Sequence, residues 1–170
     1  LYTLIPDIIS GFYEGGKLED KIGALLKSKN KTLATAESLT GGKIAATIIS
    51  VAGSSAYFKG SIVAYSAETK QSLLGVAKNT ISTNTVVSKE VAIEMARGVK
   101  EKLQTNYAIA VTGNAGPTSD HNNQGVGVVF IAFVSDDQEI VQKFNFGQPR
   151  EKVINKTVSK SLEILRKEIL

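Results

Sequence analysis

The sequence predicts an α/β fold, a three-layer α/β/α sandwich around a mixed, mostly parallel sheet closed by a C-terminal hairpin. Three observations support this prediction. Amphipathic helical segments alternate with short apolar strands through the first two thirds of the chain. The segment 107–112 is apolar on both faces, as expected for a central strand. Two longer strand patterns near the C-terminus are separated by a few turn-forming residues, which predicts an antiparallel pair.

The first half of the chain predicts two helices and two strands, followed by a short third helix. Apolar residues recur at helical spacing among charges over 17–29, which indicates an amphipathic helix. The short apolar segment 32–36 predicts a buried strand, and 40–50 predicts a helix. Residues 60–65 predict a second strand, and the short helix after it ends near Gly75.

The second half predicts a long helix, the central strand, a hairpin and a final helix. Ser88 has the side chain of a helix N-cap, and a continuous apolar stripe follows it toward the central strand. Residues 125–134 and 139–146 predict two strands joined by a Ser-Asp-Asp turn. Pro149 then opens a helix that continues to the end of the chain.

The chain divides into an opening segment and one domain. Residues 1–16 are apolar, lack a clear period and end in two glycines, so we expect a linker or arm from an upstream segment. A trimmed leader would give the same pattern. Residues 17–170 predict one continuous domain without internal repeats. Because residue 1 is Leu and the only Met is Met95, we expect the natural start to lie upstream.

The composition excludes several classes of chemistry. The chain has no Cys, which excludes disulfides, thiolate catalysis and Cys-ligated metal sites. The single His, His121, lies in a polar segment and has no second imidazole to share a metal, so we expect an exposed loop residue and no metal site. No apolar run is long enough to span a membrane. The net charge of +4 is spread over helices and only 6% of residues are aromatic, so nucleic-acid binding has no support.

Three segments that follow predicted strands could bind a ligand. In Thr35–Gly42, small polar residues at a helix start leave N–H groups for an anion, or form an ordinary capped helix start. In Thr112–Pro117, small residues admit a ligand to the backbone, or form a tight turn. Between them, Ser55 precedes Tyr65 and Lys70, and without Cys a nucleophilic serine would need Lys or Tyr as its base. Tyr and Lys at a strand end are also common surface residues.

Taken in order, these segments and several shorter ones resemble a known family. The matching stretches are Thr35–Gly42, Gly53–Phe58, Tyr65–Lys70, Val87-Ser88, Glu94–Gly98, Thr112–Pro117 and Gly147–Arg150. Their order and spacing are similar to those of the C-terminal domain of the competence/damage-inducible CinA proteins, a domain that also occurs alone as nicotinamide-nucleotide amidohydrolase. The resemblance covers about residues 17–170.

The resemblance implies hydrolysis of the carboxamide of nicotinamide mononucleotide to nicotinic acid mononucleotide and ammonia, a step of pyridine nucleotide recycling. It implies a Ser/Lys mechanism without a cofactor or metal, with Ser38 as nucleophile, Lys70 as base, Tyr65 as a supporting hydroxyl and Ser55 as the reserve nucleophile. N–H groups near the Gly41-Gly42 turn would stabilise the oxyanion. The residues expected to bind the substrate are Thr40, Gly41, Gly42, Thr112, Gly113, Ala115, Gly116 and Arg150, the last as a phosphate partner.

The resemblance also implies a cytoplasmic protein that binds a small-molecule nucleotide, a homo-oligomer with a dimer favoured, and a pyrophosphatase-like domain upstream in the full-length protein. The chain departs from the family pattern at Leu39 (usually Cys), Ala67 (usually Asn), 118–128 and Asn155 (often Arg). Two alternatives therefore stay open. One is a catalytically weak nucleotide-binding or regulatory module of a two-domain CinA protein, and the other is an amidohydrolase for a different small amide.

Overall fold

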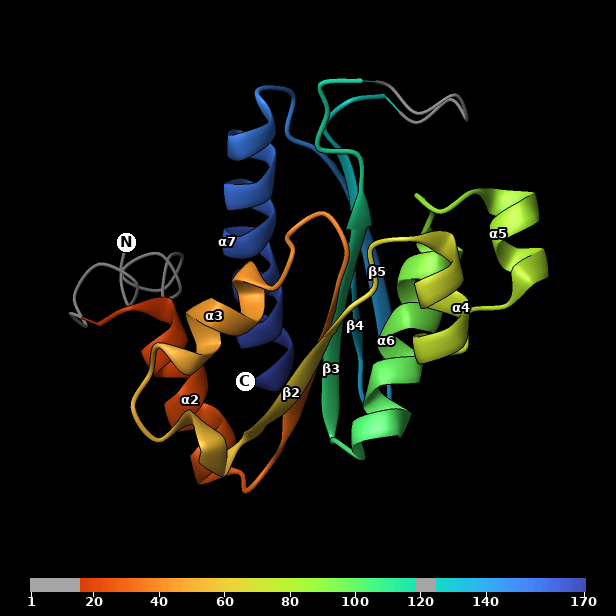
Figure 1. The fold of residues 1–170 in the computed structure, drawn as a ribbon. Coiled ribbons are helices and arrows are strands. Elements are labelled where there is room, and N and C mark those ends of the chain that lie inside the picture. Colours follow the sequence, from red (N-terminus) through yellow and green to blue (C-terminus); the bar gives the residue numbers. More distant parts are fainter. Residues whose placement is uncertain (1–15, 119–124) are drawn as a thin grey trace, which may run out of the picture.

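The protein has an open five-stranded sheet with helices on both faces (Figure 1). The computed structural model describes residues 16–118 and 125–170, and every structural statement below concerns these residues. The strand order is β2-β1-β3-β4-β5. The strands are β1 (Leu33–Glu37), β2 (Phe58–Val63), β3 (Tyr107–Gly113), β4 (Val128–Val134) and β5 (Glu139–Asn145).

The sheet is mixed, as predicted, but it is not closed. β1 pairs in parallel with β2 and β3, whereas β3 with β4 and β4 with β5 are antiparallel. The C-terminal hairpin is present, but β5 forms one edge and β2 the other. The prediction that the hairpin closes the sheet is therefore wrong, because a sheet closes only when its first and last strands pair with each other.

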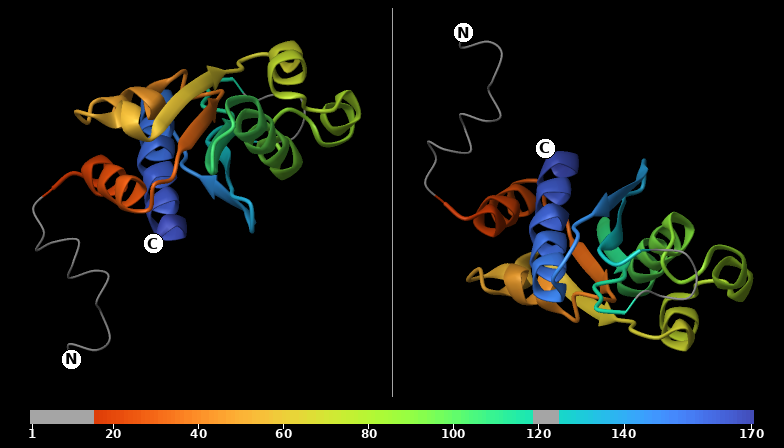
Figure 2. Two further views of the ribbon diagram at one scale, coloured as in Figure 1. Left: turned by 90° about the horizontal axis from the view of Figure 1, so that it is seen from below. Right: turned by 90° about the horizontal axis from the view of Figure 1, so that it is seen from above.

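Helices cover both faces of this sheet and complete the predicted three layers. Figure 2 shows α2, α3 and α7 on one side and α4, α5 and α6 on the other. The helices are α2 (Leu18–Ser28), α3 (Lys43–Ile49), α4 (Ala67–Leu74), α5 (Lys78–Asn84), α6 (Lys89–Leu103) and α7 (Arg150–Ile169), with a 3₁₀ turn at η1 (Ser54–Ala56). None of these helices has a stretch both long and apolar enough to cross a membrane.

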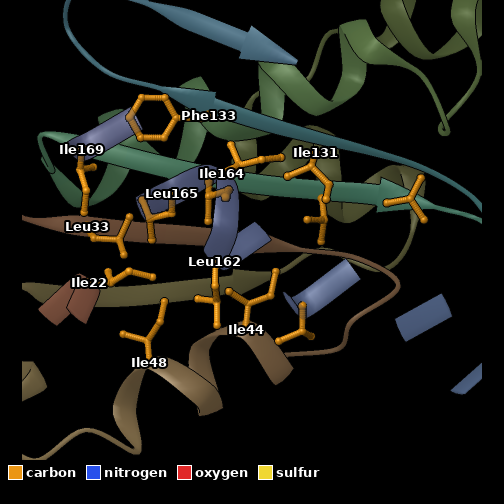
Figure 3. Packing of buried hydrophobic residues seen from close by; sticks show 14 of the residues in the cluster. Ile22, Leu33, Ile44, Ile48, Ile131, Phe133, Leu162, Ile164, Leu165 and Ile169 are labelled. Atoms are coloured by element: carbon orange, nitrogen blue, oxygen red, sulfur yellow. The ribbon is translucent and has the colours of Figure 1, made fainter. Parts of the chain in front are cut away.

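The two-residue period of β1 divides its side chains between two cores. Leu33 belongs to the core against α2, α3 and α7, where it lies near Ile22 and Leu162 (Figure 3). Ala34 and Ala36 belong to the core against α4 and α6. Odd positions of β1 therefore face α3 and even positions face α4.

Most predicted elements occur within a few residues of their expected bounds. Ser88 caps α6, its hydroxyl accepting a hydrogen bond from Val91 N–H at 3.3 Å. The helix expected from residue 40 starts only at Lys43, because Gly41 and Gly42 have φ of 60° and 99° and form a turn instead.

Candidate active site

The first strand and the fourth helix bring Ser38 and Lys70 together. Ser38 directly follows β1 and, at an even position, continues the row of Ala34 and Ala36 toward α4. Lys70 lies in the first turn of α4, and its Nζ is 3.0 Å from Ser38 Oγ. The carbonyl of Ala64 accepts a second hydrogen bond from the same Nζ at 2.8 Å. These contacts place an amine within proton-transfer distance of a hydroxyl.

Burial changes the protonation of this amine. Lys70 is only 2% exposed, and burial lowers its pKa from 10.5 to about 8. Removing a cation from water disfavours the charged form, which is the cause of the shift. With this pKa, about a tenth of the molecules carry a neutral Lys70 at pH 7.

The Ser–Lys pair opens into a cavity of about 500 Å³ at the carboxyl ends of β1 and β3. This is the edge of an open α/β sheet at which ligands usually bind. The cavity is lined by Ser38, Leu39, Tyr65, Lys70, Val86, Val87, Thr112, Gly113, Asn114, Ala115, Thr118 and Arg150. It therefore gathers seven of the residues predicted from the sequence, from Ser38 to Arg150.

Arg150 joins two sides of the cavity at its mouth. The guanidinium donates to the carbonyl of Gly116 at 2.7 Å and to the hydroxyl of Tyr65 at 3.3 Å. Tyr65 is 65% exposed. The sequence predicted it as the last residue of the second strand, but it lies after the end of β2. Gly116 takes part through its carbonyl rather than as a lining residue.

The helix start that was expected to bind an anion already holds one from the chain itself. Glu37 Oε2 accepts hydrogen bonds from Gly42 N–H and Ile44 N–H at 3.0 Å and from Thr40 Oγ1 at 2.7 Å. Its Oε1 accepts from Ala45 N–H at 2.8 Å. The N–H groups of Gly42, Ile44 and Ala45 are therefore occupied by a carboxylate and that of Lys43 by the carbonyl of Thr40, so none of them is available to a ligand.

The other N–H groups near Gly41 and Gly42 differ in whether they already have an acceptor. Gly41 N–H donates to the carbonyl of Ser38 at 3.1 Å, which closes a turn over 38–41. At its two central positions, the N–H groups of Leu39 and Thr40 donate to no other described residue. Thr40, Gly41 and Gly42 do not line the cavity, whereas Leu39 does. The structure thus does not bring the three predicted binding residues to the site.

Ser55, the reserve nucleophile, is exposed in η1, which precedes β2. Because β2 runs parallel to β1, the start of β2 lies at the amino ends of these strands, whereas Ser38 lies at the carboxyl end. The structure therefore does not bring Ser55 to the cavity.

Sequence reasoning missed Asn114, which organises the loop after β3. Its Oδ1 accepts from Gly116 N–H at 2.9 Å and its Nδ2 donates to the carbonyl of Thr118 at 3.1 Å. An Asn that directly follows a strand is a signal for such a turn, because its side chain can accept from the backbone N–H two residues on, here that of Gly116. The hydroxyl of Thr112, which was predicted to line the site, donates to the carbonyl of Val86 at 2.7 Å and ties β3 to the loop before α6.

Across 16–118 and 125–170 there is no cluster of three or more acidic or imidazole side chains that could hold a metal ion. His121 lies outside the described residues, as do residues 1–15. So do residues 119–124, which are most of the stretch 118–128 that departs from the family pattern.

The protein is thus of the open α/β class, with a buried Ser–Lys pair beside a cavity at the carboxyl ends of its strands. Comparison with known protein families shows which family it belongs to. The chain belongs to the CinA family, because the model of the CinA C-terminal domain matches residues 16–169. The resemblance found in the sequence is thereby confirmed.

Relatives and solved structures agree with this family. A CinA-like protein of Flavobacterium psychrophilum is 53% identical over 170 residues, which cover all of this chain and 41% of the relative. A putative competence-damage inducible protein of Halothermothrix orenii is 46% identical over 79% of this chain and 33% of its own length. The chain thus spans well under half of these curated relatives.

The fold matches known structures of the family. A competence or damage-inducible protein of Enterobacter asburiae superposes with a TM-score of 0.88 and 28% identity, covering 90% of this chain and 96% of that one. A homologue from Agrobacterium tumefaciens gives a TM-score of 0.82 and 32% identity over 88% of this chain and 94% of the other.

Proposed function

We propose that this domain hydrolyses the carboxamide of nicotinamide mononucleotide to nicotinic acid mononucleotide and ammonia. The observation that carries the proposal is the 3.0 Å contact between Ser38 Oγ and a buried lysine amine that opens into a cavity. Such a pair can activate a serine without Cys or His.

The reaction follows from the contacts of the pair. Neutral Lys70 takes the proton of Ser38 as Oγ attacks the carboxamide carbon, while the carbonyl of Ala64 holds the charged ammonium. The tetrahedral intermediate collapses when Lys70 returns this proton to the leaving nitrogen, which departs as ammonia. Water then adds to the acyl-enzyme, and its proton passes through Lys70 back to Ser38, which regenerates the serine and releases the acid.

The oxyanion of the intermediate requires N–H donors next to Ser38. Those of Gly41 and Gly42 are committed to Ser38 and Glu37. We assign the role to the N–H of Leu39, which follows the nucleophile and lines the cavity. In other hydrolases the residue after a nucleophilic serine supplies the same donor.

The cavity suits a mononucleotide in size and charge. Its volume of about 500 Å³ lies in the range of small-ligand sites. Arg150 uses two of the five donors of its guanidinium for Gly116 and Tyr65, which leaves donors for a phosphate. The apolar side chains of Leu39, Val86 and Val87 provide a wall for the pyridine ring.

The test measures ammonia release from nicotinamide mononucleotide by the purified domain. Ser38→Ala should abolish release, whereas the matched variant Ser55→Ala should keep the wild-type rate, because Ser55 lies at the other edge of the sheet. Release that survives Ser38→Ala would contradict the proposal, and loss with Ser55→Ala alone would move the nucleophile to Ser55.

A second candidate is a catalytically weak nucleotide-binding module. It is favoured by Asn155, which stands where the family often has Arg and accepts a hydrogen bond from Lys43 at 2.5 Å. This function predicts that nicotinamide mononucleotide raises the melting temperature of the domain without ammonia being released.

The partners of the full-length protein are a further part of the proposal. Because the curated relatives are more than twice as long as this chain, we propose an upstream domain, pyrophosphatase-like in function. We also propose a homodimer, which the mass of the purified protein in solution would test.

A further inference from the structure

Glu37 is a fully buried acid that the reaction above does not use. It is 0% exposed, and its two oxygens accept from three backbone N–H groups and from the hydroxyl of Thr40. Ser61 on β2 adds a longer contact to Oε1 at 3.4 Å. All these partners are donors, so both carboxylate oxygens are used as acceptors.

These contacts join the residues on either side of the nucleophile. Glu37 ends β1, and Ser38 begins the turn that closes with the Gly41 N–H bond to the Ser38 carbonyl. Through Thr40, Gly42 and α3, the carboxylate ties the far end of this turn to the residue before the nucleophile.

The geometry leaves little freedom to Ser38. On its N-terminal side Ser38 is anchored by β1, which pairs with β2 and β3. On its C-terminal side it is anchored by the 38–41 turn, in which the hydroxyl of Thr40 donates to Glu37. Its Oγ must lie within hydrogen-bond distance of a Lys70 amine that is itself held by the Ala64 carbonyl. A shift of about 1 Å in such a pair can cost about 10²-fold in rate.

We propose that Glu37 is a positioning residue for Ser38: its carboxylate holds the 38–41 turn and thereby fixes Ser38 Oγ against Lys70. The inference rests on the proposed role of Ser38 as nucleophile. It does not depend on which amide is the substrate, and a probe of serine reactivity can test it separately.

The test compares two variants that each remove one hydroxyl donor to Glu37 with a third variant that changes Glu37 itself. Thr40→Val removes the hydroxyl that belongs to the turn, whereas Ser61→Ala removes the hydroxyl on β2 and serves as the matched control. Glu37→Gln keeps one acceptor oxygen but places an NH₂ group where Ala45 N–H needs an acceptor. If Glu37→Gln does not fold, the pair Thr40→Val and Ser61→Ala still carries the test.

Two readouts are measured well below each variant's melting temperature. The first is kcat and KM for ammonia release from nicotinamide mononucleotide, and the second is the rate at which a fluorophosphonate labels Ser38. We expect Thr40→Val to lower kcat and the labelling rate about tenfold and Glu37→Gln about 10²-fold, with KM within about twofold and Ser61→Ala close to wild type.

The outcomes separate this inference from the proposed function. If Thr40→Val and Glu37→Gln label and turn over at the wild-type rate, with only their melting temperatures lowered, Glu37 is merely structural and the inference is overturned. If wild type releases no ammonia but Ser38 is labelled, the proposed substrate is wrong, and the order of labelling rates decides the inference. If wild-type Ser38 neither reacts with the probe nor turns over substrate, both fail.

Discussion

The lowered pKa of Lys70 gives the most direct test of the site. If neutral Lys70 is the base, kcat/KM follows the fraction of enzyme in which this amine is unprotonated. With a pKa of about 8, that fraction is about a tenth at pH 7 and about half at pH 8. The rate of ammonia release should therefore rise about fivefold from pH 7 to pH 8 and less than about twofold from pH 8 to pH 10.

The measurement is kcat/KM for nicotinamide mononucleotide from pH 6 to pH 10. A rate that keeps rising about tenfold for each pH unit up to pH 10 would indicate an ordinary, solvated lysine and would refute the reasoning from burial. Lys70→Met should lower the rate by about 10²- to 10⁴-fold. Lys78→Met, at an exposed lysine of α5, is the control and should leave the rate unchanged.

The burial of Lys70 also makes the stability of the fold depend on pH. The folded-state pKa of Lys70 is lower than the unfolded value, so the unfolded chain binds more protons between pH 8 and pH 10.5. The free energy of unfolding should rise through this range, by about 3 kcal/mol from this group alone. Lys70→Met removes this rise. At pH 7 it should stabilise the fold by about 1–2 kcal/mol, after the loss of the hydrogen bonds to Ser38 and Ala64. Denaturant titrations of both proteins at pH 7 and pH 10 measure the difference.

Three further predictions concern phosphate recognition, packing and metal dependence. Arg150→Ala should raise KM for nicotinamide mononucleotide about 10- to 100-fold and leave KM for nicotinamide riboside, which lacks the phosphate, within about threefold; equal losses for both would remove Arg150 as the phosphate partner. Gly98→Ala should lower the free energy of unfolding by about 2 kcal/mol or more, because its Cβ would lie 1.8 Å from the Leu74 carbonyl oxygen, whereas Gly16→Ala, with nothing within 4 Å, should be neutral in thermal melts. Activity should be unchanged after treatment with a chelator, and a loss that added metal restores would contradict the Ser/Lys mechanism.

The order of helices and strands could be predicted from periodicity, because most elements have an apolar stripe or segment that must be buried. The helix α5 was missed for the opposite reason, since none of its residues from Lys78 to Asn84 is buried and it carries no apolar stripe. That the segments of Ser38 and Lys70 lie at one end of the sheet could be predicted because each follows a strand, whereas the pairing of these two side chains was implied only by the family resemblance.

The anion site at the helix start shows where the sequence was insufficient. The sequence predicted that N–H groups near Gly41 and Gly42 face a bound anion, but Gly42 N–H donates to the Glu37 carboxylate and Gly41 N–H to the Ser38 carbonyl. A sequence shows that donors are available and does not show which acceptor reaches them first. Only the alternation of side chains along β1, counted back from Ser38, could have indicated that Glu37 faces α3.

Because side chains along β1 alternate between the two faces of the sheet, the site depends on the exact number of residues in this strand. Glu37 and Ser38 are neighbours in sequence but serve opposite faces of the sheet, one toward α3 and the other toward Lys70. Deleting a single residue ahead of Glu37 in β1 would turn Ser38 toward α3 and put Leu39 at the position that now faces Lys70, with the Glu37 carboxylate two residues back on that same face. The Ser38 hydroxyl and the Lys70 amine would then lie on opposite faces of the sheet, so one deletion would separate the pair. The number of residues in this strand is thus as much a part of the site as the side chains of Ser38 and Lys70 are.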